Sequence, residues 1–154
     1  WVMLMQLPEA ADFTKSDKAR RRILPDVTTD KEAKELVDDW REFVVPDLES
    51  QFNSAVQTVT DDLDMAEESE DDEGNVYHSV EIPNDHGETW YQVLNQARLI
   101  LNEEHDVEGT RELLMSGEEN PSEINEEKVL TFLQFRVYAA IQEFILTNLM
   151  GVDD

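Results

Sequence analysis

One long apolar stretch near the C-terminus, between Pro121 and Met150, constrains the fold of this chain more than any other feature. The residues from Asn120 to Glu123 are of the types that begin a helix, and Gly151 is typical of the position that follows a helix end. A helix that is apolar on nearly all sides is normally wrapped by other helices, so we expect it to be buried. Polar residues interrupt it too often for a transmembrane span.

The helical period of 3.6 residues brings large apolar side chains of this segment to one face. They are Leu130, Leu133, Val137, Ile141, Phe144 and Ile145. The expected core combines residues of this face with apolar residues of earlier segments, namely Leu133, Val137, Ile141, Phe144, Trp90, Leu94, Trp40 and Phe52.

Three further segments have helical patterns. Thr29 to Glu32 is a capping box ahead of an amphipathic helix that reaches Val44, and Pro46 ends or kinks that helix and opens the next. Glu88–Glu104 is the clearest helix after the last one, and its expected core face is formed by Trp90, Val93, Leu94, Ala97, Ile100 and Leu101. The expected fold is all-α, a helical bundle around a buried C-terminal helix, with at most one short strand-like segment. In the N-terminal part, 9–17 is polar and is expected to be a loop.

An acidic run interrupts the helical patterns. Nine of the thirteen residues from Asp61 to Glu73 are acidic, and such blocks usually stay disordered because they repel themselves. We therefore expect one helical domain, 1–154, that contains an acidic flexible linker over 61–75. The alternation from Val76 to Ile82 is typical of a strand, which would lie against helices, pair with a second copy or be an extended loop.

The charge is large and uneven. The chain carries a net charge of −25, and its residues 42–154 hold 28 acids against four bases. Such a surface repels a phosphate backbone, so we expect no direct nucleic-acid binding outside the segment from Lys15 to Arg41. The absence of Cys excludes disulfides and thiolate metal sites within the chain. No signal peptide is visible, and a Trp at position 1 indicates that the true N-terminus lies upstream.

No motif in the chain predicts catalysis, a cofactor or a metal. The histidines His78, His86 and His105 lack the Glu-x-x-His spacing of a di-iron bundle. A calcium loop beginning at Glu104 would need Glu at its twelfth position, where Met115 stands. We therefore assign no catalytic, cofactor-binding or metal-binding residue.

Isolated cations are the main candidates for interaction. Arg98 and Arg136 lie on core-forming helices in the acidic part of the chain. Each is either an anion or partner-carboxylate site, or a structural Arg paired with a nearby acid. The cluster from Arg20 to Arg22 is suited to docking on an acidic surface, including the chain's own acidic run. The candidate interaction residues are Arg20, Arg21, Arg22, Trp90, Asn95 and Arg98.

Four motifs carry a resemblance to a known family. Arg21 to Asp26 resembles an Arg-x-Leu-Leu-Pro-Asp signature, and the residues from Trp40 to Leu48 resemble the helix that follows it. The remaining two motifs are Trp90-Tyr91-Gln92-Val93-Leu94-Asn95-Gln96-Ala97-Arg98-Leu99-Ile100-Leu101 and the ending from Val137 to Gly151. Together they resemble the actinobacterial domain-of-unknown-function family 2017, also labelled an oxidative-stress-regulator family.

The resemblance implies a small, mainly helical, cytoplasmic protein that acts in stress-responsive transcription through a protein partner. Our leading hypothesis is accordingly a non-enzymatic regulatory protein that binds a protein partner, such as transcription machinery, without contacting membranes. A homodimer is also compatible with the strand-like segment. The alternatives are an acidic decoy that occupies basic nucleic-acid-binding proteins, and an enzyme with a dispersed carboxylate site. A buried acid beside Trp90 or Arg98, in a true pocket, would favour the enzyme, and a structure without one would remove its support.

Overall fold

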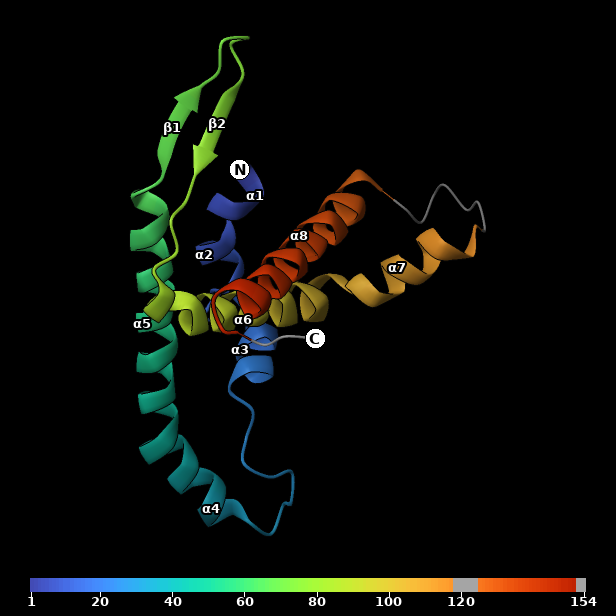
Figure 1. Ribbon diagram of the computed structural model, residues 1–154. Helices are drawn as coiled ribbons and strands as arrows, with labels where there is room; N and C mark the ends of the chain where they lie inside the picture. Colours follow the sequence, from blue (N-terminus) through green and yellow to red (C-terminus); the bar gives the residue numbers. More distant parts are fainter. Residues whose placement is uncertain (118–124, 152–154) are drawn as a thin grey trace.

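A central helix, α6 (Gly87–His105), organises the fold in the computed structural model, which describes residues 1–117 and 125–151. It packs against α2, α3, α5 and α8, as Figure 1 shows. The sequence predicted this helix almost to its ends. Its predicted core face is also confirmed, because Trp90, Val93, Leu94, Ala97, Ile100 and Leu101 are all buried.

The N-terminal segment forms three short helices, α1 (Val2–Met5), α2 (Leu7–Ala10) and α3 (Asp17–Ile23). The Ser16 hydroxyl caps α3 by accepting the backbone N–H of Ala19 at 3.0 Å. The polar loop predicted for 9–17 is only partly right, because four apolar residues in and beside it are buried against α5 or α6: Leu7, Ala10, Ala11 and Phe13.

A long bent helical rod follows. It comprises α4 (Lys34–Asp39), a π-helical turn η1 (Trp40–Val44) and α5 (Val45–Asp64). The wide turn lies directly before Pro46, whose ring nitrogen has no hydrogen to donate to the preceding turn. The proline therefore bends the rod and does not separate two antiparallel helices, and Figure 1 shows α4 and α5 as one curved arm.

The acidic run and the strand-like segment form a hairpin. Strand β1 (Glu67–Glu70) pairs antiparallel with β2 (Val76–Ser79), and Figure 1 shows the pair projecting beyond the end of α5. The flexible linker predicted for 61–75 is thus wrong, because its first residues complete α5 and the next ones form β1. The second strand pairs with the acidic run, which was not considered for it, while Val80 and Ile82 just beyond the strand pack against the helical core, as one of the three alternatives expected.

One carboxylate holds the hairpin turn. Asp71 accepts the backbone N–H groups of Glu73 and Asn75 and the hydroxyl of Tyr77, each at 2.9 Å. These hydrogen bonds, with Asn75 contributing most, lower the pKa of Asp71 to about 2. The charged carboxylate of Asp71 is therefore part of the turn. The hydrogen bonds that it accepts offset the repulsion between neighbouring acids.

The C-terminal half contains α7 (Val107–Ser116) and α8 (Glu126–Asn148), after a 3₁₀ turn, η2 (Asn84–His86), that leads into α6. Asp106 has a positive φ of 47° and caps α7 through its side chain. Asn125 caps α8 by accepting the backbone N–H of Lys128 at 2.9 Å. The helix start predicted at 120–123 lies outside the described residues. Gly151 has a positive φ of 64° beyond the end of α8, as its predicted role requires.

The prediction that α8 is the buried centre of the bundle is wrong. Its expected core residues Leu133 and Phe144 are 45% and 59% exposed, and Val137 is 37% exposed. The buried residues of α8 are instead Tyr138, Gln142 and Ile145. The fold is nevertheless mainly helical with one short strand pair, as predicted, and α6 takes the central place.

The other core predictions have mixed outcomes. Trp90 and Leu94 are buried, as predicted, and Ile141 is partly buried against the main core. Phe52 is half-buried in a smaller cluster, where its ring meets Phe13 edge-on at 6.1 Å. Trp40 is only half-buried, since it lies at the bend of the rod, away from the central helix.

Candidate interaction surface

The outward face of α8 is an apolar stripe. Its large side chains Leu130, Leu133, Val137 and Phe144 are exposed, and Ala140 lies among them. Their spacing alternates between three and four residues, which places all five on one side of a helix. We call these five residues the α8 face. A continuous apolar stripe of this kind on a protein surface marks an interaction site more often than isolated exposed apolar residues do.

Polar groups fix the opposite side of α8 against the protein. The Tyr138 hydroxyl donates to the carbonyl of Met3 at 2.7 Å and accepts from the Gln134 amide at 2.8 Å. Burial raises the pKa of Tyr138 to about 12, with the Gln134 hydrogen bond acting in the opposite direction. This network, with the buried Ile145, holds α8 in one rotation about its axis and leaves the α8 face outside.

Arg98 joins α6 to the same inner side of α8. Its guanidinium donates to the side-chain oxygen of Gln142 at 2.5 Å and lies 4.5 Å from the centre of the Phe135 ring. Gln142 in turn donates to the carbonyl of Tyr91 at 3.1 Å. Burial lowers the pKa of Arg98, and the nearby charge of Arg136 lowers it further.

These contacts favour the structural interpretation of Arg98 over a binding role, although the expected partner differs. Among residues 1–117 and 125–151, no carboxylate forms a salt bridge with Arg98, so the expected acid partner is not found there. The Nε atom of Arg98 is buried without a hydrogen-bond partner in that same part of the chain. Arg98 is thus a structural residue held by Gln142 and by the face of Phe135.

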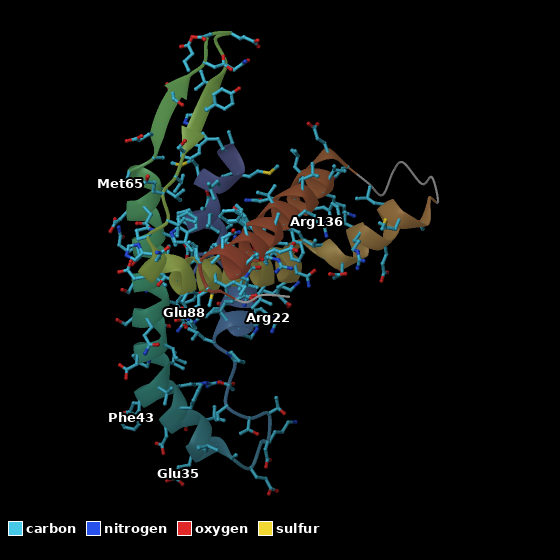
Figure 2. The ribbon with its side chains drawn as sticks, viewed as in Figure 1. Arg22, Glu35, Phe43, Met65, Glu88 and Arg136 are labelled. Atoms are coloured by element: carbon cyan, nitrogen blue, oxygen red, sulfur yellow. The ribbon has the colours of Figure 1, made fainter. Side chains whose placement is uncertain are left out.

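Two opposite charges flank the α8 face on one side. Arg136 and Glu143 are both exposed and stand seven residues apart, which is two helical turns. Neither takes part in a salt bridge within the described residues. Figure 2 marks Arg136 midway along α8. The sequence alone places Arg136 and Glu143 on one narrow polar stripe of this helix, but it does not show that the apolar residues beside them are exposed.

Trp90 has a structural role, together with two residues that the sequence did not single out. Its indole N–H donates to the Asp62 carboxylate at 2.7 Å, and His86 Nδ1 lies 2.9 Å from the same oxygen. The Asp62 side chain is 11% exposed. The hydrogen bond between Asp62 and His86 raises the pKa of His86, and the negative charge of Asp62 is a smaller contribution in the same direction. Asp62 was hidden from sequence analysis because it belongs to the acidic run.

Asp62 is an acid beside Trp90, but it is only partly buried and the pocket criterion is not met, so the enzyme hypothesis gains no support from it. A hollow of about 450 Å³ is lined by Trp90, His78 and Ile141, and neither Asp62 nor His86 lines it. The Asp62 carboxylate instead faces the two N–H groups that it binds. Within the described parts of the chain, no three His, Asp or Glu side chains lie close enough together to hold a metal ion.

The remaining candidates lie apart from the α8 face. Arg20 forms an ion pair with Glu49, while Arg21 and Arg22 are exposed on α3, where Figure 2 labels Arg22. Asn95 is exposed on α6. The structure therefore does not assemble Arg20, Arg21, Arg22, Trp90, Asn95 and Arg98 into one site.

The hairpin presents most of its acids to solvent. All four residues of β1 are exposed, and so are Asp72 and Glu73 at the turn. These carboxylates are the ones that an acidic decoy would use. By length and composition alone, α8 is also apolar enough to cross a membrane, although its inner side carries the polar network that joins it to α6 and to α1.

A family model described as "Domain of unknown function (DUF2017)" matches residues 3–149. No curated protein and no solved structure matches the chain.

Proposed function

The chain belongs to the DUF2017 family of domains of unknown function, and from that premise we propose that it is a non-enzymatic, cytoplasmic regulatory protein that acts by docking on another protein chain. The observation that carries the proposal is the α8 face. A large apolar stripe that remains outside a well-packed fold is best explained by a surface that another chain covers. Transcription machinery is the partner class predicted from the resemblance.

The α8 face favours docking over catalysis for a specific reason. Its sequence pattern is the strongest apolar signal in the chain, yet the fold places polar Gln142 and Tyr138 inside and leaves Leu133 and Phe144 outside. The inner side also carries Phe132, Phe135 and Ile141, which pack against the main core, so α8 is apolar on two sides and the fold covers only one of them. The rotation observed is therefore consistent with a helix whose outer side has a binding role.

A capture experiment tests this proposal. The purified protein would be immobilised and exposed to native lysate at low and at high salt, with the retained proteins identified. We expect the wild type to retain a polymerase or sigma-type protein, and Leu133→Glu to lose it. Leu36→Glu is the matched control, since Leu36 is exposed on α4, and the substitution adds the same charge at a distant site.

Two results would contradict the proposal. One is that Leu133→Glu retains the same proteins as the wild type. The other is that only general basic proteins are retained and that all of them are lost at high salt, because association driven by charge alone weakens as screening grows. The second result would favour the acidic decoy, with the hairpin carboxylates as its surface.

A further inference from the structure

We propose that the α8 face is covered by the α8 face of a second copy of this chain, with the two helices antiparallel. This inference rests on the proposed function, because it names one partner of the same surface. It goes further in that it specifies the identity, direction and register of the chain that covers this surface in the free protein, and a different captured protein would compete with that copy for the α8 face. Three observations lead to it: the spacing of the stripe, the charges beside it and the distribution of net charge.

The spacing of the α8 face is that of a seam between two helices. Leu130, Leu133, Val137, Ala140 and Phe144 alternate at three and four residues, which is the repeat of the inner positions of a coiled coil. From its first to its last residue the seam is about 21 Å long, at 1.5 Å per residue. The small Ala140 near the middle lets two helices approach closely.

The charges beside the seam meet opposite charges of the second copy only when the two helices run in opposite directions. Arg136 and Glu143 lie on the same side of the seam, and in an antiparallel pair the same sides of the two helices meet. With the pair centred between Val137 and Ala140, Arg136 lies about 3 Å along the axis from Glu143 of the second copy. A two-fold axis repeats this contact, so the interface contains two opposite-charge pairs.

A parallel pair lacks this complementarity. There, each side of the seam meets the opposite side of the other helix, where Gln134 and Ile141 stand. Arg136 would then face the apolar Ile141, and Glu143 would have no cation opposite. Charges beside a helical seam set the direction of pairing, so the arrangement of these two residues favours the antiparallel pair.

The net charge of the whole chain opposes association, but little of that charge lies on α8. Its residues Glu126 to Asn148 hold three acids, Glu126, Glu127 and Glu143, against Lys128 and Arg136, so α8 contributes only −1 to the net charge of −25. The acidic hairpin projects away beyond the end of α5 in Figure 1. Salt screens charges farther apart than about 8–10 Å, so the remaining repulsion is reduced at ordinary ionic strength.

Charge reversal in the full chain tests the inference. Sedimentation equilibrium would be measured for the wild type, Arg136→Glu, Glu143→Arg, the double variant and an equimolar mixture of the two single variants. We expect the wild type to dimerise and each single variant to dimerise more weakly by roughly ten-fold, because both charge pairs become repulsive. The double variant restores both opposite-charge pairs. The mixture restores them too, because one variant carries two acids beside the seam and the other carries two arginines.

Recovery in the double variant and in the mixture supports the antiparallel register. The inference is overturned if the wild type stays monomeric, or if neither the double variant nor the mixture dimerises better than the single variants. Circular dichroism of every variant shows whether it has folded, and Arg136 and Glu143 are exposed, so all of them are expected to fold. Binding of a monomeric wild type to phosphatidylcholine vesicles through Leu133 would identify a lipid surface instead and would also overturn it.

The failure of this inference is distinguishable from the failure of the proposed function. If the wild type is monomeric but Leu133→Glu still loses a captured protein, the partner is a different chain and the docking function stands. If the wild type is monomeric and Leu133→Glu captures the same proteins as the wild type, both proposals fail.

Discussion

The guanidinium of Arg98 on α6 donates a 2.5 Å hydrogen bond to the side-chain oxygen of Gln142 on α8. The amide nitrogen of Gln142 donates to the carbonyl of Tyr91, so this side chain is tied to α6 at both of its ends. A buried amide that lost these partners would be destabilising, so the pairing selects one rotation of α8. That rotation leaves Leu133 and Phe144 at the surface.

Replacement of Arg98 by Met is expected to lower the free energy of unfolding by about 1–3 kcal/mol, since it leaves the buried oxygen of Gln142 without a donor. Urea unfolding measures the change. Arg111→Met is the control, because Arg111 forms only an exposed pair with Glu108 at 3.5 Å, and its loss should change stability by less than about 0.5 kcal/mol. Unchanged stability of Arg98→Met, with loss of partner binding, would show that Arg98 is a binding residue.

The two sides of α8 should differ in their sensitivity to truncation. Ile145→Ala removes a fully buried side chain and should cost about 2–5 kcal/mol. Leu133→Ala should cost less than about 1 kcal/mol, because this side chain is half-exposed. Both are measured by chemical unfolding at low protein concentration, where association does not contribute. Equal losses would mean that α8 is rotated relative to the arrangement described.

The sequence was sufficient for α6 because local pattern and tertiary packing agree there. The six apolar residues predicted to face the core do so, and the helix ends where Asp106 takes up a positive φ. For α8, the pattern has apolar residues on nearly every side and does not distinguish an inner from an outer one. The distinction comes from two contacts between residues that are distant in the chain. Arg98 lies 44 residues before its partner Gln142, and Met3, whose carbonyl binds Tyr138, lies 135 residues before it.

The acidic run shows a second limit of sequence analysis. Its composition predicts disorder because charges of one sign repel, and this reasoning omits specific partners. Asp62 is held by Trp90 and His86, while Asp71 is held by the hairpin turn. Such partners come together only in the folded chain, so composition alone did not identify Asp62 as a structural residue.

The contact between His86 and Asp62 makes a prediction about pH. Because the pKa of His86 is raised above 6.5 in the folded protein, the charged imidazole stabilises the fold below pH 6.5, and this contribution is lost as pH rises through the folded-state pKa. Chemical unfolding across this range should show stability falling, and His86→Gln should remove that part of the pH dependence. An NMR titration would find the pKa of His86 closer to 6.5 in Asp62→Asn, and an unchanged value would contradict the assignment.

The α8 face lies outside the fold of one chain, and in our proposal another copy covers it. The chain has no Cys, so a single Leu133→Cys variant reports on this position alone. The most direct measurement is the rate at which a thiol reagent modifies that cysteine as protein concentration is raised, with Leu36→Cys as an exposed control. We expect fast modification in dilute solution and progressive protection at higher concentration, while Leu36→Cys stays reactive throughout. Slow modification at every concentration would mean that the face is buried within one chain, and fast modification at every concentration would mean that no second copy covers it.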